Sequence, residues 1–331
     1  MNPKVSVCIT TYNHEQFISQ ALDSVLMQKT DFDFEILIGE DDSEDRTRKI
    51  VKEYKRQHPD KIRLFLNDSD NIIYINGSRT GRWNFINNLK NAKGVYIALL
   101  DGDDCWTDPN KLQAQVDMLE DNPELAICIH NVKVSYMNGS KKSHPYYSPD
   151  ASGPNMRQKP ASISSIEDLI AGNFIQTPSV VYRARLFDNF PEWFYKADRA
   201  DWPLHILNAR HGKIGYIDKM MANYHVHDGG IYSGKTLAYQ LEGAANIATA
   251  LDKHLSYKYH NIIFKHNTHR FLLMIQLHLT NANYIKSCQC FFNYIKTYRT
   301  ESLTTVFNYL LDRIKISIKN QKDKAQRFRY K

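Results

Sequence analysis

The 331-residue sequence has no apolar run of the about 18 to 20 residues that a helix needs to cross a membrane. Its first residues also lack the charged start, the apolar stretch and the cleavage site of a secretory signal peptide. Together these two absences predict a protein that stays in the cytoplasm.

Cysteine is scarce, because the sequence holds only five, an odd number that cannot all pair within one chain. Most of them lie in apolar stretches, which is typical of reduced, buried thiols rather than of a disulfide framework. Cys288 and Cys290 have no second pair of Cys or His at the spacing of a zinc site, so a structural zinc ion is not expected.

Two common phosphate-binding loops are missing, because neither GxGxxG nor GxxxxGKS/T occurs anywhere in the sequence. Their absence argues against the dinucleotide-binding and P-loop classes of protein.

Positive charge is in modest excess, with a formal net charge of +7, and most of the excess lies in the last thirty residues. This stretch has few interleaved aromatic residues and no known binding module beside it, so nucleic acid is not expected as a partner. A basic end of this kind is either a solvated terminus or a contact with anionic lipid. We therefore expect residues 300–331 to allow at most a peripheral contact with the inner face of the cytoplasmic membrane.

Short β-branched runs alternate with helical patterns over the first 135 residues. This alternation predicts an α/β fold with a mostly parallel central sheet and helices on both of its faces. The expected strands are 5–10, 34–39, 62–66, 95–100 and 125–136, and the expected helices between them are 16–28, 46–58 and 83–92.

The predicted α/β domain covers residues 1–238 and includes a Pro-, Ser- and Tyr-rich loop at 143–160. Residues 239–331 form a helical C-terminal extension. Within it, apolar residues recur at spacings of three and four from Leu303 to Ile318, beside a basic face. Such a stripe packs on the domain, on a second copy of the chain or on a membrane, so an oligomer through the C-terminal helices is one expectation.

Acidic residues follow two of the expected strands directly, at the edge of an open α/β sheet where ligands bind. The run EDD occupies positions 40–42, and Asp101, Asp103 and Asp104 follow the strand at 95–100. Three carboxylates within four positions repel one another unless a cation is present. A hard divalent ion, Mg²⁺ or Mn²⁺, suits such oxygen ligands and normally shares its shell with substrate phosphates.

Two later features extend this picture. His225 and His227 follow a late strand, and His227 is the favoured candidate for completing the metal shell, with a structural hydrogen bond as the alternative. Asp201 opens a helix, where it either caps the helix or has a chemical role.

The ordered motifs VSVCITTYNHEQFISQALDSVLMQ, FEILIGEDDSEDRT and GVYIALLDGDDCWTDPNKLQAQ resemble the family 2 glycosyltransferases with the GT-A fold. The resemblance covers approximately residues 4–235 and leaves 240–331 outside. It implies a metal-dependent, inverting enzyme of the bacterial surface-glycan type. Such an enzyme moves a sugar from a UDP- or dTDP-type donor to a hydroxyl of a glycan or lipid-linked glycan.

The resemblance also implies roles for individual residues. Asp201 matches the family's general base, and the family's metal carboxylate corresponds to Asp103 or Asp104. The turn after the second strand departs from the usual DDGSTDGT pattern, because Glu stands at 40 and Asp at 42. The residues implied in nucleotide-sugar binding are Thr10, Tyr12, Asn13, Glu40, Asp41, Arg82, Asp101 and Asp103.

Two other functions remain open from the sequence. A sugar nucleotidyltransferase also combines a nucleotide, a sugar and a metal on a similar sheet, but it uses a Gly-rich basic first loop that TTYNHEQF does not supply. A catalytically inactive nucleotide-sugar-binding protein is the second alternative.

Overall fold

The computed structural model describes residues 3–139, 141–148, 157–230 and 235–298. The chain divides into two compact units, residues 1–235 and 236–331, and each is described by itself below. The division lies a few residues before the sequence-based boundary at 238. Thr236 already caps the first helix of the second unit, because its side chain accepts a hydrogen bond from the backbone N–H of Tyr239.

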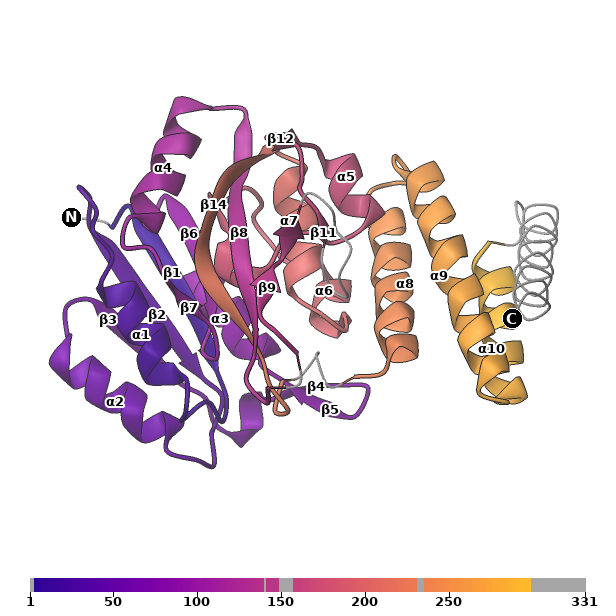
Figure 1. The fold of residues 1–331 in the computed structure, drawn as a ribbon, viewed down its shortest axis with the longest axis horizontal. Helices are drawn as coiled ribbons and strands as arrows, with labels where there is room; N and C mark the ends of the chain where they lie inside the picture. The colour runs from indigo at the N-terminus through magenta and orange to yellow at the C-terminus, as the bar shows by residue number, and fades with distance from the viewer. Residues whose placement is uncertain (1–2, 140, 149–156, 231–234, 299–331) are drawn as a thin grey trace, which may run out of the picture. The chain divides into compact units, whose positions relative to one another are not determined.

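Four parallel strands form the N-terminal half of the sheet (Figure 1). β1 (Val5–Thr11) lies between β2 (Phe34–Glu40) and β6 (Tyr96–Asp101), and β3 (Ile62–Leu66) forms the edge beside β2. β1, β2 and β6 are buried along almost their whole length, as expected for continuous apolar strands that are covered on both faces.

The other half of the sheet is mixed. β13 (Val181–Arg183) lies antiparallel between β6 and β8 (Leu125–Tyr136). β8 runs parallel to the long strand β14 (Lys213–Val226), whose register is irregular near its middle, and β12 (Ile163–Ser164) closes the edge. The predicted α/β fold with a mostly parallel sheet is confirmed.

A two-residue strand, β7 (Cys105–Trp106), pairs antiparallel with β14 and places Cys105 opposite Asn223. Because β7 directly follows the acidic turn after β6, this pairing brings that turn beside the end of β14. The pairing therefore joins two segments that lie more than a hundred positions apart in the sequence.

Several short strands were not predicted from the sequence. Two of them form a hairpin after β3, and the others lie at the two ends of the expected loop at 143–160, whose residues 149–156 are outside the described ranges. They are β4 (Ile73–Ile75), β5 (Ser78–Thr80), β9 (His144–Pro145), β10 (Tyr147–Ser148) and β11 (Arg157–Gln158).

Helices of the first unit pack on the sheet and on one another (Figure 1). α3 contacts β1 and β2, whereas α4 and α7 contact β8. Their bounds are α1 (Ile18–Leu26), α2 (Thr47–Gln57), α3 (Arg82–Asn91), α4 (Lys111–Asp121), α5 (Ile166–Ala171), α6 (Glu192–Lys196) and α7 (Asp201–Ala209).

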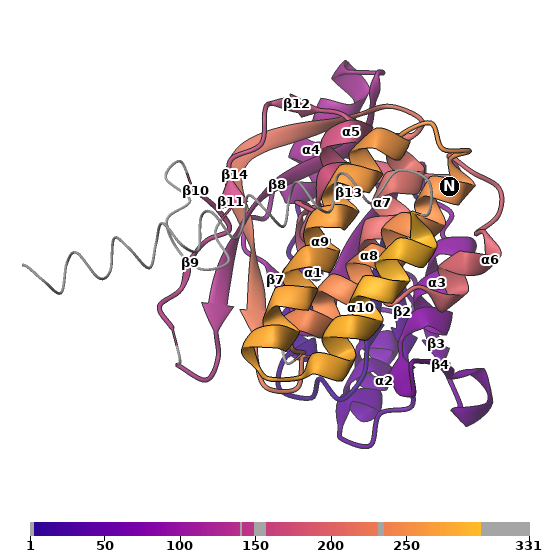
Figure 2. The same ribbon diagram turned by 90° about the vertical axis from the view of Figure 1, so that its right-hand side faces the viewer.

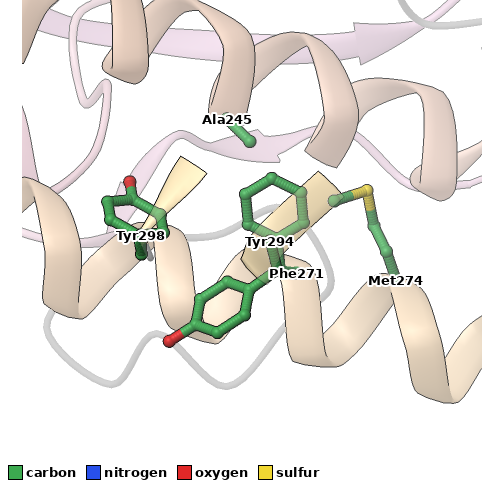
Figure 3. Close-up of a cluster of buried hydrophobic side chains, with 5 residues drawn as sticks. All are labelled: Ala245, Phe271, Met274, Tyr294 and Tyr298. Carbon is green, nitrogen blue, oxygen red and sulfur yellow. The ribbon is translucent and has the colours of Figure 1, made fainter. Parts of the chain in front are cut away.

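Helices make up the described part of the second unit, namely α8 (Leu237–His254), α9 (His260–Thr280) and α10 (Tyr284–Thr297). α9 packs against both of the others (Figure 2). Their common core contains two tyrosines, a phenylalanine and two smaller side chains (Figure 3): Ala245, Phe271, Met274, Tyr294 and Tyr298.

No described helix combines the length and the apolar character that a membrane span requires. The apolar stripe from Leu303 to Ile318 lies outside the described residues. The contact of residues 300–331 with a membrane therefore stays a prediction.

Gly94 precedes β6 at a point where the backbone leaves no room for a side chain. A Cβ added there would lie 2.5 Å from Ser6 N, 2.7 Å from Tyr96 O and 2.8 Å from Val5 C. These are backbone atoms of paired strands and cannot turn aside, so Gly94→Ala should lower the free energy of unfolding by about 1–3 kcal/mol. Denaturant unfolding measures this change.

Gly172→Ala is the matched control, because nothing lies within 4 Å of a Cβ added at Gly172. We expect this control to stay within about 0.5 kcal/mol of the native protein. Equal stabilities of the two variants would contradict the packing described for β1 and β6.

Candidate active site

Asp101 ends β6 and lies opposite Thr10 of β1 in the parallel register. Thr10 Oγ1 donates a hydrogen bond of 3.2 Å to Asp101 Oδ1. The hydroxyl of Thr177, which begins the short helix η2 (Thr177–Ser179), also hydrogen-bonds to this carboxylate. Two different elements therefore hold Asp101 at the edge of the sheet.

Two histidine side chains lie next to the carboxylate of Asp103 in the acidic turn. His227 Nε2 lies 3.0 Å from Asp103 Oδ2, and His14 Nε2 lies 3.7 Å from the same oxygen. The ring of Phe17 stacks beside His227, with 4.7 Å between the ring centroids. The structure brings together the predicted residues Asp103 and His227, and it adds His14, which sequence reasoning missed.

Asp104 is turned inward and is only 2% exposed. Its Oδ1 accepts a hydrogen bond of 2.9 Å from His225 N, whereas Oδ2 has no hydrogen-bond partner among the described residues. His225 Nδ1 lies 2.7 Å from the backbone oxygen of Asp103, so this histidine holds the turn. A buried carboxylate oxygen without a partner is costly, which favours a proton or a cation next to Asp104.

The carboxylates around this turn shift one another's pKa values. Burial, followed by the charges of Asp103 and Asp201, raises the pKa of Asp101 to about 7. Burial and the charges of Asp103 and Asp101 raise the pKa of Asp104 well above its usual value. Burial acts upward on Asp103 as well, but the hydrogen bond from His227 and the charges of nearby histidines outweigh it and lower that pKa. Among these charges, that of Asp201 comes from the start of α7.

Gly102 explains how the segment after β1 reaches the acidic turn. A Cβ at Gly102 would lie 2.6 Å from Thr11 Oγ1 and 2.9 Å from His14 Nδ1. These two atoms lie 3.3 Å from each other. The missing side chain therefore leaves the space in which the imidazole of His14 sits against the turn.

Asp201 is the first residue of α7, after Ala200 at the N-cap, and no side-chain hydrogen bond caps this helix. The capping alternative is therefore not supported, although an acidic side chain still suits the first turn. Asn173 Nδ2 donates a hydrogen bond of 3.0 Å to Asp201 Oδ2 and holds the carboxylate in place. The neighbouring Trp202 is 1% exposed and donates to Leu169 O, so it belongs to the core.

Asp41 follows β2 in an environment that is nearly closed to solvent. Its Oδ1 accepts hydrogen bonds of 3.0 Å from Asn67 Nδ2 and 2.8 Å from Asn84 Nδ2. Burial raises the pKa of Asp41 to about 6, and these two hydrogen bonds work in the opposite direction. Both asparagines were missed from the sequence, because no motif marks them.

Glu40 ends β2 and is 0% exposed. Its Oε1 accepts a hydrogen bond of 2.7 Å from Ser43 N, and its Oε2 pairs with Arg48 Nε of α2. A buried carboxylate needs such compensation. Both oxygens of Glu40 are engaged within the protein, so this residue supports the turn after β2. A contact between Glu40 and the nucleotide stays a prediction.

The guanidinium of Arg79 lies over the ring of Tyr12, 4.3 Å from the ring centroid, in a cation–π contact. Arg79 Nη2 donates to Asp41 O, and Arg79 Nε has no hydrogen-bond partner among the described residues. Arg79 comes from the β4–β5 hairpin, whose strands are too short to be predicted from a sequence pattern. It joins the predicted residues Tyr12 and Asp41 in one cluster.

Asn13 has a φ of 53°, in the left-handed region that asparagine tolerates better than most residues. Its N–H donates to Ser43 Oγ over 3.0 Å, and its Oδ1 accepts from Glu44 N over 2.9 Å. Asn13 therefore ties the end of β1 to the turn after β2. A direct contact between Asn13 and the donor stays a prediction.

Arg82 is 4% exposed and donates hydrogen bonds of 2.8 Å to the backbone oxygens of Phe194 and Ala197. Burial lowers the pKa of Arg82 to about 10, against the charges of Asp201 and Asp198, which raise it. In this arrangement Arg82 holds the segment that leads into α7. Its predicted place beside a diphosphate stays a prediction.

Within the described ranges, no three His, Cys, Asp or Glu side chains are already arranged around one metal position. The donor chemistry nevertheless fits a divalent ion. The Asp103 carboxylate and the imidazole nitrogens of His14 and His227 next to it offer a mixed nitrogen and oxygen donor set. Such a set suits Mn²⁺ better than Mg²⁺, which prefers oxygen ligands.

A family model described as Glycosyl transferase family 2 matches residues 6–183, more than half of the chain. The chain belongs to glycosyl transferase family 2. The predicted resemblance is thereby confirmed, and the nucleotidyltransferase alternative is set aside. Most predicted site residues of this glycosyltransferase lie inside the matched range, whereas Asp201 and His227 lie beyond it.

Curated relatives agree with this assignment. An uncharacterised protein of Mycobacterium tuberculosis is 36% identical over 229 residues, which is 69% of this chain and 60% of the relative. The chain therefore spans less than two thirds of that relative's length. An uncharacterised glycosyltransferase of Nostoc is 30% identical over 68% of this chain and 65% of its own.

A shorter match concerns an enzyme with a named reaction. The UDP-Glc:alpha-D-GlcNAc-diphosphoundecaprenol beta-1,3-glucosyltransferase of Escherichia coli is 38% identical over 118 residues. This match covers 36% of this chain and 42% of the relative.

Two solved structures show the fold. TarS 1-349 of S. aureus, in complex with UDP-GlcNAc, aligns with a TM-score of 0.52 at 18% identity, over 93% of this chain and 92% of that one. The mannosyltransferase PcManGT of Pyrobaculum calidifontis, in complex with GDP-Man and Mn²⁺, aligns with a TM-score of 0.53 at 16% identity, over 98% and 88%. The predicted GT-A fold is confirmed.

Asp41 allows a pH-dependent prediction. Its pKa rises from 3.8 to about 6 on folding, so the folded protein binds this proton more tightly and loses stability as the pH rises through that window. Asp41→Asn keeps an oxygen for Asn67 and Asn84 but carries no charge. We expect the variant to gain about 1–3 kcal/mol over the native protein at pH 8.

Urea unfolding of both proteins at pH 4 and pH 8 measures this gain. At pH 4 the native carboxyl is already largely protonated when folded, so the two proteins should differ much less. A stability difference that does not change between the two pH values would show that burial of the Asp41 charge has been assigned wrongly.

Proposed function

We propose that this family 2 glycosyltransferase transfers a sugar from a nucleoside-diphosphate sugar to an acceptor hydroxyl with inversion at the anomeric carbon. One observation carries the proposal. Asp101, at the end of β6, and Asp201, at the start of α7, are close enough for the charge of one to raise the pKa of the other. The residues expected to handle the diphosphate and the acceptor proton therefore share one site.

The nucleotide occupies the cluster at the ends of β1 and β2. Tyr12 and Arg79 supply a flat, cationic surface for a base or a phosphate, and Asp41 offers a carboxylate that can accept the imide N–H of uracil or thymine. A UDP- or dTDP-type donor fits this chemistry best. The neighbours support the donor class, because TarS was solved with UDP-GlcNAc and PcManGT with GDP-Man.

Asp103 and His227 would hold a divalent ion, with His14 and Asp104 next to them. When bound, Mn²⁺ or Mg²⁺ neutralises the charge that develops on the leaving nucleoside diphosphate. Of the two aspartates, Asp103 is the better ligand candidate, because its Oδ2 faces both imidazoles. Asp104 instead uses one oxygen on the backbone of His225.

Asp201 acts as the general base. Its carboxylate takes the proton of the acceptor hydroxyl while the acceptor oxygen attacks the anomeric carbon. The bond from that carbon to the β-phosphate oxygen breaks, and the nucleoside diphosphate leaves with the bonding electrons. A single displacement of this kind inverts the anomeric configuration and needs no nucleophilic side chain. Asn173 keeps the carboxylate oriented through its hydrogen bond.

The acceptor belongs to the class of glycans or lipid-linked glycans that build cell-surface polysaccharide. The E. coli relative supports this class, because its name specifies a diphosphoundecaprenol acceptor. An enzyme with such an acceptor would work in the cytoplasm at the inner face of the membrane. Contact of residues 300–331 with anionic lipid, and an oligomer through the C-terminal helices, belong to the same proposal.

Asp201→Asn tests the assignment of the base. The amide keeps the hydrogen-bonding shape but cannot take the acceptor proton, so we expect release of nucleoside diphosphate to fall at least about 100-fold. Binding of the same nucleotide sugar should change less than about twofold. The measurement is a screen of UDP-, dTDP- and GDP-sugars with Mn²⁺, following nucleoside diphosphate release, with calorimetry for binding.

Asp198→Asn is the control, because Asp198 lies three positions earlier and accepts a hydrogen bond from Asn76 that an asparagine can still accept. It should keep native turnover. Native turnover of Asp201→Asn would remove the base from the mechanism.

A further inference from the structure

Asp41 has a single polar atom without a hydrogen-bond partner in the described part of the chain. Its N–H donates to Thr11 O over 3.0 Å, and its backbone oxygen accepts a hydrogen bond from Arg79. Its Oδ1 accepts hydrogen bonds from the side-chain amides of Asn67 and Asn84, whereas no described residue donates to its Oδ2. The protein thus holds the backbone and one carboxylate oxygen of Asp41 and leaves the other oxygen for a ligand.

The two amides are unequally shared between the oxygens of Asp41. A carboxylate offers about four lone-pair sites on its two oxygens. Donors that only compensate the burial of this group would be divided between the oxygens, because each buried oxygen needs a partner. Both amides instead donate to Oδ1, over 3.0 and 2.8 Å. This arrangement fixes the rotation of the carboxylate as well as compensating its charge.

Space lies open beside Oδ2 of Asp41, next to Gly81, the N-cap residue of α3. A Cβ added at Gly81 would lie 2.8 Å from Asp41 Oδ2, and beyond the chain neighbours of Gly81 no other atom of the described residues lies within 4 Å of that position. The missing side chain therefore leaves room for a ligand atom beside Oδ2. Tyr12 and Arg79, the proposed surface for the base, belong to the same cluster as Asp41.

The two asparagines come from different elements, and the protein holds both side chains. Asn67 follows β3 and is 1% exposed. Its Oδ1 accepts a hydrogen bond of 3.1 Å from Asp68 N, which leaves its NH₂ group for Asp41. Asn84 lies on α3 and is 0% exposed. It packs against Gly39, where an added Cβ would lie 2.7 Å from Asn84 Cβ. Neither amide can easily follow a carboxylate that turns.

We propose that Asn67 and Asn84 are positioning residues that set the base specificity of the donor, because they hold Asp41 Oδ1 and so leave Oδ2 to accept the ring N–H of the base. The inference rests on the proposed function. The rings of uracil and thymine carry an N–H where the cytosine ring has only a lone pair. An acceptor that is fixed in place therefore favours uracil and thymine over cytosine.

Asp41→Asn tests which atom reads the base. The new side chain has one oxygen and one NH₂ group, and its oxygen must face Asn67 and Asn84, because both of them donate. Its NH₂ group then replaces Oδ2 and donates where the native protein accepts. We expect the native protein to bind UDP at least about tenfold more tightly than CDP, and the variant to lose or reverse this preference. Calorimetry with Mn²⁺ measures both affinities.

Asn84→Ala tests the positioning itself. It removes one of the two donors to Oδ1, so we expect the ratio of the affinities for UDP and CDP to fall at least about threefold. Asn88→Ala is the matched control. Asn88 lies one turn later on α3 and is also 0% exposed, but its amide donates to Ile9 O over 2.8 Å. This control should keep the native ratio even where it lowers the stability of the fold.

Each other result has a defined meaning. If Asp41→Asn keeps the native preference for UDP, Oδ2 does not read the base, and the inference is overturned. It is also overturned if Asn84→Ala keeps the native ratio or if Asn88→Ala changes that ratio as much. Should Asn84→Ala fail to fold, Asp41→Asn decides alone, because that variant is expected to be more stable than the native protein.

The native protein separates this inference from the proposed function. Equal affinities for UDP and CDP would overturn the inference and leave the transferase function in place. If the native protein binds no nucleoside diphosphate and cleaves no nucleotide sugar, the proposed function fails, and the inference fails with it.

Discussion

Mutual repulsion among buried carboxylates is the constraint on which this site depends. Asp101, Asp103 and Asp104 follow one strand within four positions, and the fold adds Asp201 from α7. Burial makes each negative charge more costly, as the raised pKa values of Asp101 and Asp104 show. Such an arrangement persists only if protons, hydrogen bonds or a bound cation compensate it. In the proposed function, a bound cation supplies this compensation and shares the site with the phosphates of the donor.

The surrounding charged residues divide into two groups. One group lies at the site itself: Asp103 faces two imidazoles, and Arg79 Nε has no hydrogen-bond partner in the part of the chain that the structure describes. The side chains of the other group make their hydrogen bonds and ion pairs with other residues of the protein. Glu40 pairs with Arg48, and Arg82 holds two backbone oxygens ahead of α7. This second group holds the turn after β2 and the segment before α7, so a polar residue in a motif can support the fold.

The sequence predicted the features that depend on local patterns. The buried strands β1, β2 and β6 are continuous apolar runs, and the acidic turns follow them directly, so the fold class and the positions of Asp41 and Asp101–Asp104 could be inferred. The pairing of β7 with β14, which brings His227 to Asp103, depends on a contact between distant segments that no local pattern encodes. The position of His227 after a late strand suggested it as a metal ligand, and the resemblance to a family suggested Asp201 as the base.

Local patterns and the family resemblance did not identify the site residues that lie outside the motifs. Arg79 comes from a hairpin of two three-residue strands, which are too short to give a periodic signal. His14, Asn67 and Asn84 are ordinary polar residues until the fold places them against Asp103 and Asp41. The pair of Glu40 with Arg48 was not predicted, because Arg48 lies on a helix whose orientation the sequence does not give.

The central claim is that the crowded carboxylates hold a cation together with the phosphates of the donor. It is tested most directly by the affinity for nucleoside diphosphates with and without Mn²⁺, in the native protein and in Asp103→Asn. The account predicts that Mn²⁺ tightens binding at least about tenfold in the native protein, which is about 1.4 kcal/mol, and that this gain is lost in the variant. Equal affinities with and without Mn²⁺, or the same gain in both proteins, would contradict it.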